Sequence, residues 1–585
     1  MELFDYLDEE AIGTVHSVDT GTVNVSVSDV ESLRGLQVNR LVALQSSKAG
    51  QHLIGLVTKI TRKSDPSVNG DSSRNEEDDD PLHDLAYGEI NFIKVVLAGT
   101  LFDRIGTKPN IFKRSLDTVP EIDAFCFPIE GERLTNFMKA ISELSGDEEK
   151  LALGHYSLDE NAEAFLNGNR FFQRHAVLVG STGSGKSFAT ARMLEQVAKL
   201  KSSNAILFDI HGEYAPLGEG FISGLRIAGP QDLANGKTLD DGVLYLPYWL
   251  FGYEEIMSML VDRSDQNAPN QAMVLSREIV SAKEKKLREA GDTETLENFT
   301  IDSPIPYDLN EIITELERLN TEMVPGSGNK EKQGDFHGKL SRLISRIRNK
   351  SSDRRLGFMF QGGSDSYEMD WLIRLAKALV GTKHDNGTSG VKVIDFSEVP
   401  SDILPLIASL VARIVFQIQQ WMDSESRHPI AIFAEEAHLY IPNDLHKGIS
   451  EVSLDTFERI AKEGRKYGVG LVIVSQRPSE VNRTVLSQCN NTIALRLTNA
   501  EDQAVVKRLL PETLGGLIDS LPVLDTGEAI VVGDSSLLPS KIRVGMPHKK
   551  PLSGTVDFWD EWSKDSLKGN THGAVTSWRR QGGNS

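Results

Sequence analysis

The segment 180–187 constrains the fold more than any other part of the chain. It reads Gly-Ser-Thr-Gly-Ser-Gly-Lys-Ser, follows the apolar run 175–179, and opens a helical pattern that extends to about Leu200. A Gly-x4-Gly-Lys-Ser sequence between a strand and a helix is the pattern of a P-loop. In a P-loop, backbone N–H groups and the helix N-terminus face phosphate oxygens. The pattern therefore predicts a parallel α/β sheet with a phosphate site at this position.

The residues of this loop have separate expected roles. Lys186 is expected to reach the β and γ phosphates of ATP, and the Ser187 hydroxyl is expected to bind Mg²⁺. The other expected phosphate-cradle residues are Gly180, Ser181, Thr182, Gly183, Ser184, Gly185 and Phe188. The predicted cofactors are thus ATP and Mg²⁺.

Two acidic residues match the second requirement of a P-loop enzyme, which is a carboxylate at the end of a neighbouring strand. The apolar run 430–434 leads directly into Glu435 and Glu436. We predict that Glu435 holds the magnesium shell and that Glu436 polarises the attacking water as general base. The first acid is usually Asp, so Glu435 departs from the common pattern. The alternative, two surface carboxylates, is disfavoured by the apolar residues before them.

Another strand, 205–208, ends in the sequence Asp209-Ile-His-Gly-Glu-Tyr214. Asp209 has two possible roles. It could support the metal or the water, or it could cap a turn, for which Asp is common. We favour the role in the site.

The segment 459–478 supplies two further candidates. Gln476 follows the strand 471–475, and a polar residue there can sense the γ-phosphate. Arg465 lies just before Gly468, a predicted helix C-cap, where a cation also favours the helix dipole. The competing interpretation makes Arg465 an arginine finger that reaches the nucleotide of a neighbouring subunit. Arg459 and Arg496 are weaker candidates for this finger.

The remaining chain separates by its periodicity. Short alternating strands in 11–62 predict a small β-barrel, and the residues 64–82, with the acidic run 76–80, predict a solvated loop. Residues 254–385 lack a strand signal and predict helices, while the last 40 residues resemble an arm that needs a partner surface. The predicted strands are 13–18, 22–27, 53–60, 89–99, 124–128, 176–179, 205–208, 391–396, 430–434, 471–475, 492–497, 528–533 and 540–544, and the clearest helical periods in 254–385 are 309–319 and 340–347.

The predicted domains follow from these patterns. At roughly 150 residues per domain, 585 residues suggest about four domains. The motifs reduce this number to one motor core, a β-barrel, a helical insertion and an arm. The expected boundaries are 1–150 for the barrel domain, 151–255 and 386–545 for the core, 256–385 for the insertion and 546–585 for the arm.

A net charge of −21 excludes a nucleic-acid binder that is basic throughout, but it leaves room for a local basic surface. Six cations fall between 342 and 355, and Arg346, Arg348 and Lys350 are our candidates for DNA phosphate contacts. A solvated helix face explains this cluster equally well. For the cluster of Lys283, Lys285, Lys286 and Arg288, which alternates with glutamates, we favour the solvated face.

Two cysteines far apart, Cys126 and Cys489, argue against a disulfide scaffold or a cysteine-based zinc site. No run of about 18 uncharged apolar residues occurs, since Arg413 interrupts the nearest one, 404–418. The N-terminus lacks the basic and apolar regions of a signal peptide. We therefore expect a cytoplasmic protein with no membrane partner.

Four segments together resemble the HerA family of ring-forming, FtsK-like DNA translocases. They are 174–187, 209–214, 435–438 and 463–468 with the following 475–479. The resemblance covers about residues 10–62 and 150–545. It implies a RecA-like P-loop NTPase core, an N-terminal β-barrel of the HAS type and a C-terminal arm that embraces the next subunit. It also implies a homo-hexamer that moves double-stranded DNA through a channel, with a nuclease or sirtuin-like effector, in DNA processing or anti-phage defence.

Three functions are compatible with the sequence. The leading one is an ATP-driven translocase or helicase for double-stranded DNA. The second is an ATP-regulated hexameric scaffold that docks and activates an effector through its barrel side. The third is a conjugation or secretion motor, against which the lack of an apolar anchor counts.

Overall fold

The computed structural model describes residues 4–65, 88–102, 111–114, 116, 118–143, 150–157, 159–218, 222–325, 330–382, 390–443, 449–510, 515–536, 538–554, 557–564 and 569–580. The chain divides into two compact units. The first comprises residues 1–193, 476–479 and 489–547, and the second comprises 194–475, 480–488 and 548–585. This division runs through the expected core, and the expected domain boundaries stay a prediction. Of the expected acidic loop 64–82, the first two residues belong to β4. The rest lies outside the described residues.

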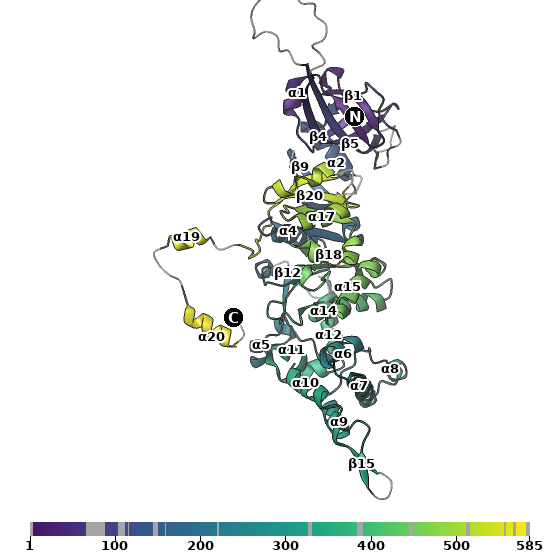
Figure 1. Ribbon diagram of the computed structural model, residues 1–585, viewed down its shortest axis with the longest axis vertical. Helices are drawn as coiled ribbons and strands as arrows, with labels where there is room; N and C mark the ends of the chain where they lie inside the picture. Colours follow the sequence, from purple (N-terminus) through teal and green to yellow (C-terminus); the bar gives the residue numbers. More distant parts are fainter. Residues whose placement is uncertain are drawn as a thin grey trace, which may run out of the picture. The chain divides into compact units, whose positions relative to one another are not determined.

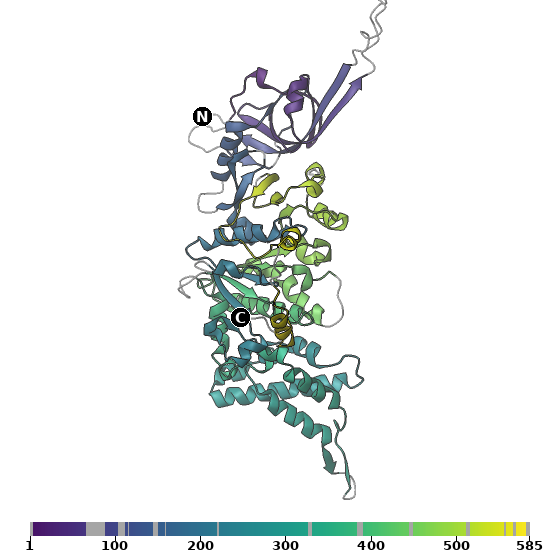
Figure 2. The same cartoon turned by 90° about the vertical axis from the view of Figure 1, so that its left-hand side faces the viewer.

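Six strands of the first unit close into a β-barrel, which confirms the prediction for the N-terminal region. The neighbours follow the order β2-β1-β7-β3-β4-β5, and the pairing of β2 with β5 closes the ring. Alternate side chains such as Val23, Val25 and Leu53 are fully buried and form the barrel core. The long antiparallel pair β4–β5 is visible in purple in Figure 2. The strands are β1 (Gly13–Asp19), β2 (Thr22–Ser26), β3 (Leu41–Gln45), β4 (Gln51–Asp65), β5 (Gly88–Phe102) and β7 (Phe125–Pro128), with β6 (Ile111–Lys113) added to β5 and the helices α1 (Val30–Gly35) and α2 (Gly131–Glu143).

The first unit also contains a run of strands in the order β10-β19-β20-β21-β8-β9. Only β10 and β19 are parallel, and the other neighbours are antiparallel. The alternation of the sequence does not predict β8 and β9, whose pairing contains two register shifts. The elements are β8 (Lys150–Tyr156), β9 (Asp159–Asn167), α3 (Gly168–Gln173), β10 (Ala176–Val179), α4 (Lys186–Ala198), β19 (Asn491–Leu495), α17 (Ala500–Leu509), α18 (Gly515–Ile518), β20 (Glu528–Gly533) and β21 (Ser540–Val544).

The second unit is built on parallel strands in the order β13-β12-β16-β11-β17-β18. Every residue of β11, β17 and β18 is buried, as expected for parallel strands covered on both faces. This arrangement confirms the predicted α/β class. The elements are β11 (Ala205–Asp209), β12 (Ile222–Ile227), α5 (Pro230–Ala234), β13 (Val243–Leu244), β16 (Val391–Asp395), α14 (Leu404–Trp421), β17 (Ile430–Ala434), α15 (Ile449–Glu463), β18 (Val469–Ser475) and α16 (Arg483–Ser487).

Between β13 and β16 the chain is mostly helical, as predicted (Figure 1). Helices α9 and α10 bury apolar stripes, with Leu316 and Ile347 fully enclosed. The helices are α6 (Tyr253–Leu260), α7 (Ala268–Ala290), α8 (Thr293–Asn298), α9 (Leu309–Thr321), α10 (Ser341–Ser352), α11 (Gly357–Phe360) and α12 (Trp371–Val380), and a small hairpin joins β14 (Met323–Pro325) to β15 (Glu331–Gln333).

One expectation about this insertion is wrong. Lys283 is not on a solvated face: it is fully buried, and its Nζ atom donates to the carbonyl oxygens of Ile301 and Ser303, each at 2.6 Å. Burial lowers the pKa of Lys283 to about 8. Lys285 and Arg288 are exposed and ion-paired, as a solvated face requires. A lysine can be buried when its ammonium group finds carbonyl acceptors, and the local charge pattern does not reveal them.

The apolar run 404–418 lies in α14, most of whose residues are buried. The Nη2 atom of Arg413 pairs with the buried carboxylate of Glu255 at 2.7 Å and donates to the Leu250 carbonyl oxygen at 2.8 Å. No helix in the described part of the chain is long and apolar enough to cross a membrane. The C-terminal segment contains α19 (Phe558–Trp562) and α20 (Thr571–Arg580), and its three tryptophans are exposed.

Candidate nucleotide-binding site

The predicted P-loop connects the buried strand β10 to helix α4 in the first unit. Gly183 and Gly185 have φ angles of 73° and 101°, which side-chain-bearing residues rarely adopt. A Cβ atom at Gly180 would lie 2.4 Å from Ser184 Oγ, and one at Gly185 would lie 3.3 Å from the Cα atom of Gly527. The loop conformation therefore requires glycine at these positions, and it turns the chain into the N-terminus of α4.

Neighbouring loops of the first unit hold this loop by its backbone. The N–H of Ser181 donates to the carbonyl oxygen of Arg496 at 2.9 Å, and the N–H of Gly527 donates to that of Ser184 at 2.9 Å. The Thr182 hydroxyl donates to the side-chain oxygen of Gln476 at 2.8 Å. The structure thus brings the predicted sensor Gln476 into contact with the P-loop.

The acidic pair follows β17 in the second unit. Glu435 and Glu436 are 2% and 5% exposed. Glu436 has a φ of 45°, a strained conformation for a residue with a side chain, of the kind that concentrates at functional sites. Both acids follow a buried strand, as expected. They are not surface carboxylates, which was the alternative interpretation.

Three aromatic side chains hold the two glutamates. The Tyr214 hydroxyl donates to Glu435 Oε1 at 2.6 Å, and the Tyr440 hydroxyl donates to the backbone oxygen of Glu435 at 2.8 Å. His438 Nδ1 lies 3.3 Å from Glu436 Oε2. The sequence analysis does not assign roles to these residues. The signal was their position within or directly beside the motifs that contain the acids.

Asp209 ends β11, but its carboxylate is directed to its own loop. Its two oxygens accept the N–H groups of Glu213 at 3.0 Å and Tyr214 at 2.9 Å. Burial raises the pKa of Asp209 to about 6, and these hydrogen bonds oppose the shift. In this structure Asp209 therefore caps the turn that follows β11, which is the alternative role considered for it.

Arg465 lies in the 3-10 turn Gly464–Tyr467 that follows α15, and its side chain is exposed. Gly468 has a φ of 71° and caps this turn, as predicted. Arg459, a weaker candidate for the finger, contacts Gln420 and Glu463 and covers the ring of Phe416. Of these two arginines in the second unit, Arg465 is the one whose guanidinium makes no ion pair or side-chain hydrogen bond with a described residue.

The basic cluster near α10 is partly neutralised. Arg348 forms an ion pair with Glu317, and Arg342 lies 3.8 Å from Asp265. Arg346 and Lys350 make no ion pair with a described residue. Two of the three candidate phosphate contacts are thus available to a polyanion, and the third is occupied.

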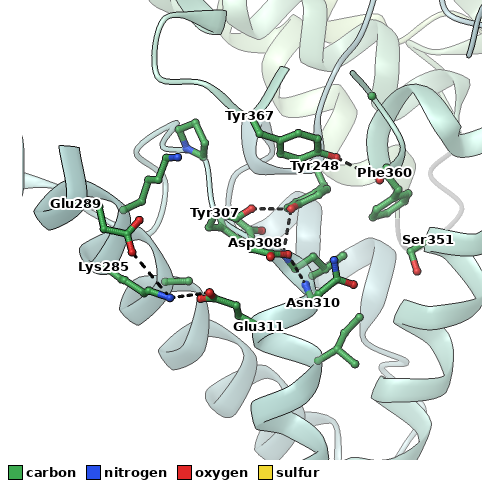
Figure 3. Close-up of a pocket in the computed structure, with 16 residues that line it drawn as sticks. Tyr248, Lys285, Glu289, Tyr307, Asp308, Asn310, Glu311, Ser351, Phe360 and Tyr367 are labelled. Carbon is green, nitrogen blue, oxygen red and sulfur yellow. Dashed lines mark hydrogen bonds and ion pairs between the residues drawn. The ribbon is translucent and has the colours of Figure 1, made fainter. Parts of the chain in front are cut away.

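A separate pocket of about 460 Å³ lies within the helical insertion (Figure 3). Its polar groups are engaged with one another: Lys285 pairs with Glu311 at 2.6 Å, and the Tyr248 hydroxyl donates to the Tyr307 carbonyl oxygen at 2.6 Å. The ring of Tyr248 stacks on Phe360 at a centroid distance of 5.7 Å. None of the predicted site residues lines this pocket.

Known proteins match most of the chain. A family model described as "Helicase HerA, central domain" matches residues 151–415, and one described as "Helicase HerA-like C-terminal" matches residues 409–544. The bacterial conjugative coupling protein TrwBdeltaN70 resembles the structure with a TM-score of 0.44 and 13% identity, over 71% of this chain and 93% of that one.

Three curated relatives are named "DNA double-strand break repair helicase HerA". The protein from Saccharolobus solfataricus is 27% identical over 70% of this chain and 71% of its own length. The protein from Sulfolobus acidocaldarius is 26% identical over 69% of this chain and 71% of its own length. The protein from Pyrococcus furiosus is 24% identical over 71% of this chain and 74% of its own length. The two family models run from residue 151 to residue 544 and include the P-loop, the paired glutamates and Gln476. The chain therefore belongs to the HerA helicase family of P-loop ATPases.

Proposed function

We propose that this ATPase is a motor that translocates along double-stranded DNA. The observation that carries the proposal is a glycine-dependent P-loop together with two buried glutamates at a strand end, in a chain of a helicase family. The names of the relatives refer to DNA double-strand break repair, which supports duplex DNA as the track.

The residues of the P-loop fit a nucleotide. The glycines allow close approach of the backbone, and the N–H groups at the start of α4 add the positive end of a helix dipole. Lys186 contributes a charge next to them. The oxygens of Ser187 and Glu435 are the hard ligands that Mg²⁺ prefers, and Mg²⁺ would neutralise phosphate charge there.

Glu436 acts as the general base in this proposal. It accepts a proton from the water that attacks the γ-phosphate of ATP, which yields ADP and phosphate. Its buried, strained backbone fixes where the carboxylate lies, and His438 contacts it at 3.3 Å. Gln476, bonded to Thr182 of the P-loop, reports the presence of the γ-phosphate to the end of β18.

We further propose a homo-hexameric ring in which Arg465 acts on the nucleotide of the next subunit. Its exposed position after α15 leaves the guanidinium accessible to another copy. Native mass spectrometry with and without ATP and DNA tests the ring. A hexamer is expected under at least one of these conditions, and a monomer under all of them would contradict the proposal.

The closed N-terminal barrel is the proposed docking module for a nuclease or a sirtuin-like effector, in repair or anti-phage defence. Removing residues 1–150 tests this assignment. We expect loss of effector binding with DNA-stimulated hydrolysis retained. Normal effector binding by the truncated chain would eliminate the docking role.

Translocation itself is tested by displacement of streptavidin from biotin on one end of a linear duplex. The intact protein with ATP is expected to displace it, and the non-hydrolysable analogue ADPNP is expected to give none. Hydrolysis of ATP without any displacement would favour the ATP-regulated scaffold over the motor.

A further inference from the structure

Tyr214 contacts Glu435, the carboxylate proposed to hold the magnesium shell. It is fully buried, and its hydroxyl donates to Glu435 Oε1 at 2.6 Å. The two residues follow neighbouring parallel strands, because β11 pairs with β17 in a register that places Phe208 opposite Ala434. The contact therefore joins the carboxyl ends of two adjacent strands within the second unit.

The loop that carries Tyr214 is fixed on both sides. The Asp209 carboxylate accepts the N–H groups of Glu213 and Tyr214, and Gly212 between them has a φ of 70°. The carbonyl oxygen of Glu213 accepts the N–H of Leu552 at 2.7 Å. The hydroxyl of Tyr214 is thus held in place before any nucleotide binds.

We propose that Tyr214 is a positioning residue for Glu435, which sets the orientation in which this carboxylate meets the magnesium shell. The inference rests on the proposed function, since it assumes that Glu435 serves the metal. A hydroxyl that donates to a carboxylate makes a strong hydrogen bond and selects one side-chain orientation. Partners behind a ligand typically change metal affinity by about 10- to 100-fold when they are lost.

This role explains the sequence motif around Asp209. The acid holds the turn, the glycine permits it, and the tyrosine delivers the hydroxyl to Glu435. A tyrosine buried only for packing would not need its hydroxyl at this place, because phenylalanine fills the same volume.

The test uses Tyr214→Phe, which removes one oxygen atom. The matched control is Tyr248→Phe, because Tyr248 is also buried and also donates over 2.6 Å, to the Tyr307 carbonyl oxygen in the helical insertion (Figure 3). Binding of the full chain to ADPNP is measured by calorimetry, once with Mg²⁺ and once with EDTA. The ratio of the two dissociation constants isolates the metal-dependent part.

We expect Tyr214→Phe to weaken binding about tenfold with Mg²⁺ and to leave binding in EDTA unchanged. Unchanged binding in EDTA also shows that the variant is folded. The control Tyr248→Phe is expected to keep the wild-type ratio. A wild-type ratio in Tyr214→Phe, or an equal loss in both buffers, would overturn the proposal.

A double substitution supplies a second readout. In a Glu435→Gln background, Tyr214→Phe is expected to cause no further change in the Mg²⁺ ratio, because the carboxylate to be oriented is gone. A full additional tenfold effect would contradict the proposal. Wild-type protein that binds no ADPNP would instead overturn the proposed function, so the two failures are distinguishable.

Discussion

His438 Nδ1 lies 3.3 Å from Glu436 Oε2, and the two side chains are only 9% and 7% exposed. The same nitrogen is 3.3 Å from the hydroxyl oxygen of Ser475, the last residue of β18. The next residue, Gln476, bonds to Thr182 of the P-loop. Within the second unit, these contacts therefore join the proposed base Glu436 to the end of β18.

Replacing His438 by Ala is expected to lower kcat for ATP hydrolysis about tenfold with little change in KM. The reason is that Glu436 loses a contact that fixes its carboxylate, while the phosphate loop is untouched. Leu439→Ala is the control, since Leu439 is adjacent but 40% exposed. Steady-state kinetics with duplex DNA measure both variants. A rise in KM at constant kcat would argue for a binding role instead.

Arg465→Ala is expected to lower hydrolysis by about a thousandfold if the residue is a finger in trans. Mixing it with Lys186→Ala should restore part of the activity, because some interfaces then combine an intact finger with an intact P-loop. Arg459→Ala serves as the comparison and is expected to be milder. No recovery in any mixture, with rings still formed, would exclude this geometry.

Asp209 predicts a pH dependence of stability. Burial raises its pKa to about 6, above the value of 3.8 for a free aspartate, so the folded state binds the proton more tightly. Its contribution to stability is therefore fully present below the unfolded pKa and is lost as the pH rises through about 6. Between pH 5 and pH 8 the change amounts to about 1 kcal/mol.

The difference in melting temperature between wild type and Asp209→Asn measures this contribution, since other titrating groups cancel in the comparison. Asn removes the titration and keeps one acceptor for the loop N–H groups. We expect a wider gap at pH 5 than at pH 8. A gap that stays constant or widens with rising pH would show that Asp209 is ionised in the folded state throughout.

The cations of α10 are expected to contribute unequally to DNA binding. Arg346→Glu and Lys350→Glu should weaken binding to any duplex sequence and reduce its salt dependence. Arg348→Glu should have a smaller effect on binding, because Glu317 already neutralises that arginine. Fluorescence anisotropy at several salt concentrations tests the order. Equal losses for all three variants would contradict the predicted order, and no loss for any of them would assign this face to solvent.

The strong local patterns of the sequence predict much of the fold. The strands 430–434, 528–533 and 540–544 have the predicted bounds. The first is a wholly apolar run that ends at two glutamates, and the other two have the spacing of a hairpin. The strands β8 and β9 escape prediction, because their alternation is broken by register shifts that only the paired neighbour explains.

The candidate site divides in the same way. The P-loop and the two glutamates carry their own signal, since each follows a buried strand. Tyr214, Tyr440 and His438 do not, because their importance lies in contacts made through space after folding. The burial of Lys283 cannot be predicted from the sequence for the same reason. Its acceptors are carbonyl groups that lie 18 and 20 residues further along the chain.

The central claim is tested most directly by the rate of ATP hydrolysis with and without duplex DNA, in wild type, Lys186→Ala and Glu436→Gln. We predict that DNA stimulates the wild type, that both variants lose hydrolysis, and that Glu436→Gln still binds ADPNP. A hydrolysis rate that is the same with and without DNA, or that is unchanged by either substitution, would contradict the account of a DNA motor driven from this site.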